Sequence, residues 1–481
     1  MNKILRVKPL RLILLSFIVF VVVSCGDLNP YRPSGETETI LENTSAISKR
    51  ITFGEKSLAF GQESFNPQRE KAVRSIADGE DDTATRILTD YLKSKPNDPE
   101  ARIFLNNLKV KNPYHTIAVS VPISSNLGAS QEILRGVAHA QSDWNNSRSV
   151  SGGMLKVAIA DDDDDNPNNG TKIAEEVATE LAKTKEILGV VGHYSSDTSL
   201  ATANIYEKNQ LVSISPISTS VQLIDNTPYF FRTVPSDRAA AQALARYAQA
   251  QLNSPKAVVF YNSDSNYSKS LSQEFISLLG TLNIIRREDP DCDLSTWSKN
   301  PEDWGEKATE VLKKAKRDSA NVLMLAPSSG YLDQALEIVQ VNKGNLPVLG
   351  GDDVYSPRTL DKGRDSAVKM VVAIAWDIDA NETDSDFPKR SQELWGTASV
   401  NWRTITAYDA TLALAKAIDD QAQPTREGVR EKLSSNFSTP GAFKTVKFSD
   451  TGDYDGDIQL VEVKKIGSQY DFVPLMTYLI N

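Results

Sequence analysis

Residues Leu188–Leu223 read LGVVGHYSSDTSLATANIYEKNQLVSISPISTSVQL and contain two short apolar runs that each end in a cluster of hydroxyl side chains. The first run, Ile187–Val191, stops at Gly192, and short polar residues then lead into a helical segment, Ser199–Lys208. The second run, Leu211–Ile214, is followed by the polar turn Ser215–Ser220. Because parallel strands end at the same edge of a sheet, both polar turns are predicted to face one small ligand.

The chemistry of such an edge suits an anionic group. The first turn of a helix has unpaired backbone N–H groups and a partial positive charge, and hydroxyl side chains beside it add further donors. A carboxylate is therefore the ligand group that this pattern favours. Ser and Thr are also ordinary capping and loop residues, so a purely structural role for the hydroxyls stays open on chemistry alone.

Strand-like and helix-like patterns alternate along the chain from Tyr114 onward. Strands are predicted at Ile117–Val121, Leu155–Ala160, Ile187–Val191, Leu211–Ile214, Ala257–Tyr261, Val322–Ala326, Pro347–Leu349 and Met370–Ala375. Helices are predicted at Gln131–Trp144, Thr171–Lys183, Arg238–Ala250, Lys269–Leu279, Trp304–Lys316, Tyr331–Val341 and Thr406–Asp419. This alternation is typical of doubly wound parallel sheets, and roughly 365 residues of it exceed one sheet, which predicts two lobes. Near the C-terminus, Phe443–Phe448 and Ile458–Val463 are predicted to pair as a hairpin.

The order and spacing of two motifs are similar to those of the type I periplasmic-binding-protein family, in particular its leucine/isoleucine/valine and related amino-acid-binding members. The motifs are the GHxxS turn at Gly192–Ser196 and the ISPxxTS turn at Ile214–Ser220. The resemblance extends from about Thr116 to the C-terminus and implies an α/β fold of two lobes, each a doubly wound parallel sheet, joined by three crossovers. By this resemblance lobe one comprises residues 116–233 and 375–452, and lobe two comprises residues 234–374 and 453–481.

The resemblance also implies which residues hold a ligand. On lobe one, hydroxyls and backbone N–H groups would bind an α-carboxylate, and they belong to Ser195, Ser196, Ser218, Thr219 and Ser220. On lobe two, Tyr267 would close over the ligand, Ser328 would line the side-chain pocket, and Asp352 would pair with the ligand ammonium. Branched-chain binders tend to carry Glu at the last position, and the many hydroxyls fit a polar amino acid or an amide equally well. The structural alternatives are an exposed Tyr267 before a helix and a turn residue at Asp352.

The N-terminus has the pattern of an export signal. Four basic residues, Lys3, Arg6, Lys8 and Arg11, precede the apolar run Leu12–Val23, which is too short to span a membrane comfortably. Residues 1–24 are therefore predicted to be a signal peptide, with an uncleaved signal anchor as the alternative. Val22–Gly26 resembles the bacterial lipobox, which implies acylation of Cys25 and a lipid-anchored protein that faces the periplasm or the exterior. Residues 25–48 are polar and are predicted to form a tether.

Charge and cysteine content limit the partners. Removal of the four basic residues of the signal takes the formal net charge from −10 to −14, so nucleic acid and anionic lipid headgroups are not expected partners. Cys292 is the only other cysteine, so acylation of Cys25 leaves no internal disulfide.

Residues 49–112 are predicted to form a small helical segment before the two lobes. The spacing of Ala84, Leu88 and Pro96 resembles one tetratricopeptide repeat and the start of another, but the early Trp and Gly of that repeat are missing. One repeat cannot bury its own apolar face. The segment must therefore pack on the following domain, bind a partner, or have neighbouring repeats within residues 49–66. Packing on the following domain is the preferred interpretation.

The sequence predicts no metal site, no cofactor and no catalytic site. The acidic run Asp161–Asp165 is interpreted as a solvated turn rather than a calcium site, and Asp450–Asp457 as a hairpin turn. His115, His139 and His193 are the only histidines, and the sequence has no HExxH, GxSxG, Walker A or CxxC motif. The acidic neighbours of Cys292 argue against a nucleophilic thiol, so the chain is predicted to be non-enzymatic.

These patterns lead to one main hypothesis and two alternatives. The main hypothesis is an extracytoplasmic solute-binding lipoprotein that captures an amino acid or related small polar ligand by hinge closure and passes it to the permease subunits of an ABC importer. The first alternative is an interaction scaffold, because lipoprotein activators of penicillin-binding proteins also join tetratricopeptide-like helices to a binding-protein-like domain. The second alternative is a ligand sensor that presents its state to a membrane receptor.

Overall fold

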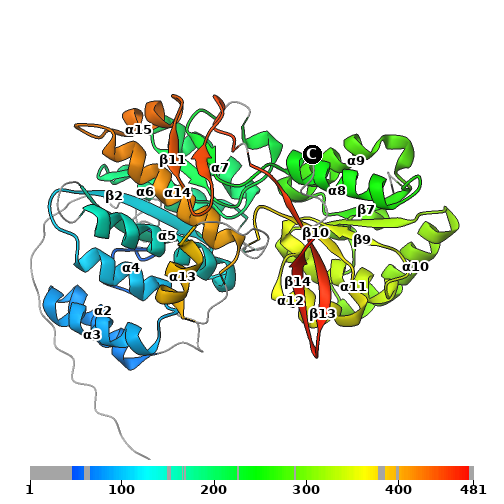
Figure 1. Cartoon of the computed structure of the whole chain (residues 1–481), viewed down its shortest axis with the longest axis horizontal. Coiled ribbons are helices and arrows are strands. Elements are labelled where there is room, and N and C mark those ends of the chain that lie inside the picture. The colour runs from blue at the N-terminus through cyan, green and yellow to red at the C-terminus, as the bar shows by residue number, and fades with distance from the viewer. Residues whose placement is uncertain are drawn as a thin grey trace, which may run out of the picture. The chain divides into compact units, whose positions relative to one another are not determined.

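The computed structural model describes residues 46–58, 66–148, 153–164, 166, 170–224, 227–286, 289–377, 385–396, 400–454 and 456–475 (Figure 1). The predicted signal peptide, the predicted acylation site Cys25 and the tether up to residue 45 lie outside the described residues. No helix within the described ranges has both the length and the apolar character that a membrane crossing requires.

Two six-stranded sheets form the body of the fold. The first sheet has the strand order β1-β3-β2-β4-β5-β6, in which β1 is antiparallel to β3 and the other neighbours are parallel. Its strands are β1 Ile51–Thr52, β2 Tyr114–Val121, β3 Met154–Asp161, β4 Ile187–Val191, β5 Val212–Ser215 and β6 Phe230–Arg232. The second sheet has the order β14-β13-β10-β9-β8-β7, with β7 to β10 parallel and β13 and β14 antiparallel. Its strands are β7 Ala257–Tyr261, β8 Val322–Ala326, β9 Val348–Gly350, β10 Val371–Ile374, β13 Gln459–Ile466 and β14 Gln469–Pro474.

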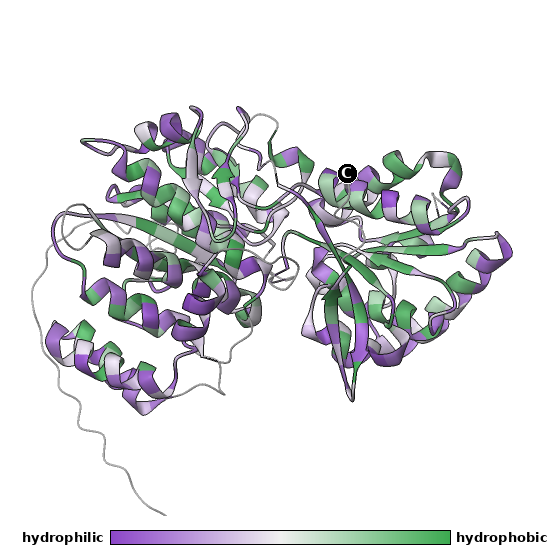
Figure 2. Cartoon of the chain, in the orientation of Figure 1, coloured by the Kyte–Doolittle hydropathy of each residue, from purple (hydrophilic) through white to green (hydrophobic). Residues whose placement is uncertain are grey.

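Helices cover the sheets, as expected where parallel strands are apolar on both faces. They are α2 Pro67–Ala77, α3 Asp81–Ser94, α4 Pro99–Leu108, α5 Leu127–Arg148, α6 Lys172–Lys183, α7 Ser196–Lys208, α8 Asp237–Gln251, α9 Asn266–Leu279, α10 Trp304–Arg317, α11 Leu332–Asn342, α12 Pro357–Gly363, α13 Phe387–Trp395, α14 Trp402–Asp419 and α15 Arg426–Leu433. Figure 2 shows strands that are largely hydrophobic and helices that carry hydrophilic residues on their outer sides.

The predicted α/β class is confirmed, because every predicted strand and helix is present and both sheets are mostly parallel. The main difference at the decisive stretch is the start of α7, which begins at Ser196 rather than Ser199. The reason is that Ser195 caps the helix, since its side chain accepts a hydrogen bond from the Thr198 N–H.

The predicted C-terminal hairpin is wrong. The strand β12, Thr445–Lys447, pairs with β11, Ser438–Pro440, whereas β13 pairs with β14. Both observed pairings close shorter loops than the predicted one, and shorter loops cost less chain entropy. A bridge between Phe448 and Tyr454 joins the first predicted arm only to the predicted turn, not to the second arm.

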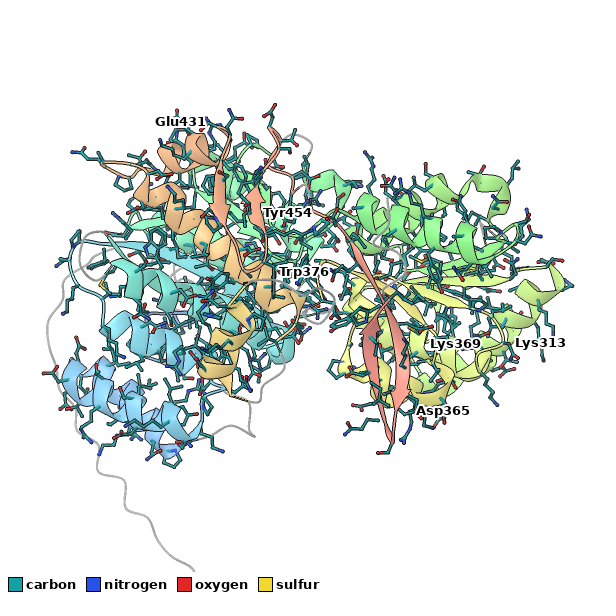
Figure 3. The ribbon with its side chains drawn as sticks, viewed as in Figure 1. Lys313, Asp365, Lys369, Trp376, Glu431 and Tyr454 are labelled. Atoms are coloured by element: carbon teal, nitrogen blue, oxygen red, sulfur yellow. The ribbon has the colours of Figure 1, made fainter. Side chains whose placement is uncertain are left out.

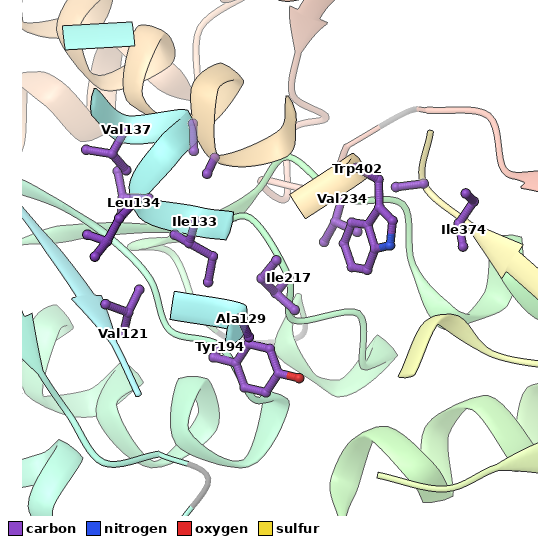
Figure 4. Close-up of a cluster of buried hydrophobic side chains, with 14 of the residues drawn as sticks. Val121, Ala129, Ile133, Leu134, Val137, Tyr194, Ile217, Val234, Ile374 and Trp402 are labelled. Carbon is purple, nitrogen blue, oxygen red and sulfur yellow. The ribbon is translucent and has the colours of Figure 1, made fainter. Parts of the chain in front are cut away.

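Helices α5 and α14 pack against the first sheet beside its carboxyl-terminal edge. Ile133, Leu134 and Val137 of α5 lie next to β2 in Figure 4, and all three are at most 1% exposed. The two helices approach closely at Gly136, where a Cβ atom would lie only 2.2 Å from the carbonyl oxygen of Thr404. The C-terminal helix α14 therefore packs within the same core as the first strands.

The N-terminal helical segment packs on the first sheet and on α5, which is the preferred of the three alternatives above. The side-chain amide of Asn107 in α4 donates to the Val157 carbonyl at 2.8 Å, and its oxygen accepts from the Val157 N–H at 2.9 Å. Asn106 donates to the carbonyl of Ala138 at 3.2 Å. The same segment supplies β1, a strand that the sequence pattern did not predict.

The buried carboxyl of Asp409 in α14 makes stability depend on pH. Asp409 is 7% exposed, accepts a hydrogen bond from the Ala442 N–H at 2.7 Å, and has its pKa raised by burial from 3.8 to about 7. A raised folded-state pKa means that this stabilisation is complete below the unfolded-state pKa and is lost as the pH rises through about 7. We expect Asp409→Asn to flatten the decline in unfolding free energy between pH 4 and pH 8, by a few kcal/mol at about 1.4 kcal/mol per pKa unit. Urea unfolding at several pH values measures this, and an unchanged slope would contradict it.

Candidate functional site

A cleft of about 770 Å³ lies at the carboxyl ends of strands from both sheets. Most of its lining comes from the turns after β3, β4 and β5 on one side and from the turns after β7, β8 and β9 on the other. Open parallel sheets bind ligands at this edge, because polar turns and helix starts converge there.

All predicted ligand residues except Ser220 line the cleft, namely Ser195, Ser196, Ser218, Thr219, Tyr267, Ser328 and Asp352. Ser220 is fully buried, its side chain caps the 3-10 turn Val221–Leu223, and its N–H donates to the Ser196 hydroxyl at 3.2 Å. Ser220 thus holds the second turn against the first instead of facing the cleft. The Ser220 side chain faces the core, and neither the alternation of apolar and polar residues nor the composition of the turn reveals this.

The start of α7 already holds a carboxylate from the protein itself. The backbone N–H of Ser195 donates to Asp164 at 2.6 Å, and the hydroxyls of Ser195 and Thr198 also donate to it. Burial, reinforced by the nearby Asp162 charge, raises the pKa of Asp164 to about 7. Asp164 lines the cleft, and sequence reasoning missed it as a site residue.

The interpretation of Asp161–Asp165 as a solvated turn is wrong for Asp161, Asp162 and Asp163, which are buried. Asp161, Asp162 and Asp163 are 7%, 0% and 4% exposed, and Asp161 pairs with Arg50 at 2.6 Å. Asp165 lies outside the described residues. Among the described residues, no group of three or more His, Cys, Asp or Glu side chains is arranged to hold a metal ion.

A buried chain of hydrogen bonds holds the first cleft turn, Gly192–Ser196, from the side of the core. His193 lies 2.6 Å from Asp162 through Nδ1 and 2.8 Å from the Tyr206 hydroxyl through Nε2, and Ser120 donates to the same Asp162. All four side chains are at most 1% exposed. The histidine of the GHxxS turn therefore orients the turn from the core, where satisfied buried networks are rigid.

The second turn is held by Arg232, whose guanidinium donates to the carbonyls of Thr219 and Ser220 at 2.8 and 2.9 Å. Its other side pairs with Asp453 at 2.6 Å. Thr219 lines the cleft, and its buried hydroxyl lies against the carboxyl of Asp237. Burial raises the pKa of Asp237 to about 7, and the hydrogen bond from the Thr219 side chain opposes that rise.

Tyr267 and Asp352 form part of the opposite wall. Tyr267 is 7% exposed, and its hydroxyl lies against Gly351, where a Cβ atom would come within 2.4 Å of it. The structural alternative of an exposed Tyr267 is therefore excluded. Burial raises the pKa of Asp352, while the Tyr267 hydroxyl and the positive charge of Arg403 act in the opposite direction.

The two walls touch each other at the rim of the cleft. Tyr194 meets the Ser329 hydroxyl at 2.9 Å, and Asp197 in the first turn of α7 accepts from the Asn266 N–H at 3.0 Å and from the Ser265 hydroxyl at 3.1 Å. Asp197 thus caps α9, a helix of the other wall, and favours the closed arrangement.

The chemistry of this lining is that of binding. It consists of hydroxyl donors, carboxylate acceptors and aromatic faces, which together can hold a small polar molecule. Cys292 lies outside the lining, and burial raises the pKa of its thiol to about 12.

Comparison with known proteins agrees with the fold. The sequence profile of the family described as periplasmic binding protein matches residues 115–468. A Leu/Ile/Val-binding protein homolog 1 from Brucella abortus is 21% identical over 355 residues, which cover 72% of this chain and 87% of the relative.

Two solved structures share the fold at low identity. An ABC transporter substrate-binding protein from Desulfitobacterium hafniense in complex with Leu has a TM-score of 0.61 at 22% identity, covering 75% of this chain and 100% of its own. A solute-binding protein from R. palustris in complex with 4-hydroxybenzoate has a TM-score of 0.59 at 15% identity, covering 75% and 96% of the two chains. These homologues are solute-binding proteins, not enzymes.

Proposed function

Since the chain belongs to the periplasmic binding protein family, we propose that it is an extracytoplasmic solute-binding lipoprotein that captures an amino acid or related small polar ligand for an ABC importer. The observation that carries the proposal is the cleft of about 770 Å³, which is lined from both sheets by hydroxyls and carboxylates. A ligand that contacts both walls stabilises the closed state and is released when they separate.

In this proposal the ligand is bound by complementary groups on the two walls. The hydroxyls of Ser196 and Thr219, with Ser195 and Ser218 beside them, receive a carboxylate, and the place of all four residues in the cleft lining supports this. On the other wall Asp352 receives the ammonium, Tyr267 covers it, and Ser328 lines the side-chain pocket. A charge-assisted bond of this kind is stronger in a closed, desolvated cleft than in water.

The remaining parts of the proposal concern location and partners. Acylation of Cys25 anchors the protein to the membrane, and of the predicted tether 25–48 the residues up to 45 act as the tether, because Ile47 is buried in the core. The proposed lobes are residues 116–233 with 375–452, and residues 234–374 with 453–481. Permease subunits of the importer are the proposed protein partners, and the family implies a location outside the cytoplasm.

Thermal unfolding of the purified protein against amino acids, amides, short peptides, urea and aromatic acids tests the proposal. A ligand that binds only the native state adds about 2.7 kcal/mol of stability at a hundredfold excess over Kd. We expect a clear rise of the midpoint with one chemical class. The protein is first unfolded, dialysed and refolded so that carried-over ligand is absent.

A folded protein that responds to none of these compounds would contradict the proposal. The interaction scaffold would then be the better explanation, since the transport proposal assigns no role to the helices α2–α4.

A further inference from the structure

The cleft has a strong excess of negative side chains. Among its described lining residues there are six aspartates and one lysine, namely Asp164, Asp197, Asp264, Asp333, Asp352, Asp353 and Lys299. Lys299 is exposed. Asp333 is compensated from outside by Arg358 and Lys362. The buried guanidinium of Arg403 offsets the charges of Asp352 and Asp353. The excess negative charge in the cleft is therefore that of Asp164, Asp197 and Asp264.

Three of these aspartates accept from neutral donors. Asp164 accepts from Ser195 and Thr198, Asp197 from Ser265 and Asn266, and Asp264 from the Asn262 amide at 2.7 Å and from the Tyr331 hydroxyl. Within the described part of the chain, none of the three takes part in an ion pair. Neutral donors orient a carboxylate but do not cancel its charge, so this part of the cleft lacks a positive partner. Burial raises the pKa of Asp164 to about 7, and a bound cation would favour its charged form.

The start of α7 has little capacity left for a second anion. Its Ser195 N–H and the hydroxyls of Ser195 and Thr198 are already directed at Asp164. A ligand carboxylate can use the Ser196 and Thr219 hydroxyls, but a ligand with two anionic groups would meet Asp164 or Asp264 with its second one. Like charges brought together in a desolvated cleft repel strongly.

An unpaired acceptor in the same cleft calls independently for a hydrogen-bond donor. Gln334, in the first turn of α11, is 9% exposed, and its Oε1 has no hydrogen-bond partner among the described residues. It lines the cleft together with Tyr331, Asp264 and Trp304. A group rich in N–H donors would satisfy this oxygen and the nearby carboxylate at once, and aromatic rings beside them favour a cation.

We propose that the ligand carries a positively charged amine or guanidinium group, which binds among Asp264, Gln334 and Tyr331 on one wall and Asp164 on the other. This inference rests on the proposed solute-binding function and names the class of solute. The two sources of such a group are a basic amino acid, which also has a carboxylate for Ser196 and Thr219, and a simple amine, which has none.

Isothermal titration of the purified protein with matched compounds tests the charge directly. L-arginine and L-citrulline have nearly the same shape and differ in the charge of the end group, and agmatine lacks the carboxylate of L-arginine. We expect L-arginine to bind about ten- to a hundredfold more tightly than L-citrulline, the ratio that one charge-assisted hydrogen bond supplies. Agmatine binding as tightly as L-arginine would identify a simple amine, and weaker agmatine binding would identify a basic amino acid.

Two single-charge variants and one control assign the effect to the cleft. Asp264→Asn and Asp164→Asn should each lower the preference for L-arginine over L-citrulline about tenfold. Asp365→Asn removes one charge outside the cleft lining, where Asp365 pairs with Lys465 at 2.8 Å, and should leave the preference unchanged (Figure 3).

The possible outcomes distinguish a failure of the positively charged ligand from a failure of the proposed solute-binding function. Binding of leucine or glutamine with no binding of L-arginine, L-lysine or agmatine would overturn the positive charge and leave solute binding intact. Equal affinity for L-arginine and L-citrulline would also overturn it. Absence of binding by any compound, charged or neutral, would overturn both.

Discussion

Replacing Asp352 by Asn is expected to weaken binding of the ligand found in the thermal screen by roughly a hundredfold, because a desolvated charge then loses its partner. Asp352 lies beside Gly351 and Tyr267 in the wall of the cleft, where burial raises its pKa. The folded protein disfavours a charge there unless a cation neutralises it. A bound ammonium does so, which is why the carboxylate contributes to affinity although it adds little to stability.

The measurement is the Kd of wild type and variant by isothermal titration, together with urea unfolding of both ligand-free proteins. We expect the affinity to fall while the unfolding free energy stays the same or rises, since Asn removes the cost of burying a carboxylate. The control is Asp90→Asn on α3, an exposed carboxylate that pairs with Lys93 far from the cleft lining. An unchanged Kd for the Asp352 variant would show that the assigned site is wrong.

Arg426→Ala is expected to be the most destabilising single change among the residues discussed here, by about 3 kcal/mol, because several buried carbonyls lose their donor at once. Arg426 is 9% exposed, and its guanidinium donates to the carbonyls of Ile187, Ala182, Asn209 and Thr184 at 2.8, 2.9, 3.3 and 2.7 Å. These carbonyls belong to the end of α6, the start of β4 and the end of α7. One side chain of α15 thus joins three elements at the start of β4, the end of the strand opposite to the first cleft turn.

Urea unfolding at two salt concentrations measures this effect and its origin. The loss should depend little on salt, because the partners are neutral carbonyls rather than carboxylates. The matched control is Arg430→Ala on the same helix, whose guanidinium pairs with Glu427 at a partly exposed site and should cost less than about 1 kcal/mol. A loss below 1 kcal/mol for Arg426→Ala would contradict the expected role.

The strands and most of the cleft residues could be predicted from the sequence, because both depend on the pattern of neighbouring residues. Apolar runs such as Ala257–Phe260 and Val322–Ala326 are buried from end to end, and this is visible in the sequence as an uninterrupted run. Ser195, Ser196, Ser218 and Thr219 follow such runs directly, so the topology of a parallel sheet brings them to one edge. Their place in the chain is almost sufficient to locate the cleft.

The missed features all depend on contacts between distant segments. Asp164 belongs to an acidic run that resembles a solvated turn, and only its distant partners Ser195 and Thr198 make it part of the cleft. The C-terminal pairings were wrong because several strand-like segments competed, and short loops decided among them.

The sequence by itself determined the α/β alternation, the two polar turns and an overall negative charge, since burial period, turn chemistry and composition are properties of neighbouring residues. Only the tertiary structure decided that Ser220 faces inward, that Asp164 occupies the start of α7, and that α4 docks on the first sheet through Asn107. These depend on hydrogen bonds between residues dozens of positions apart. At that separation the packing of the helices and strands decides which side chains meet, and the pattern of neighbouring residues does not encode that packing.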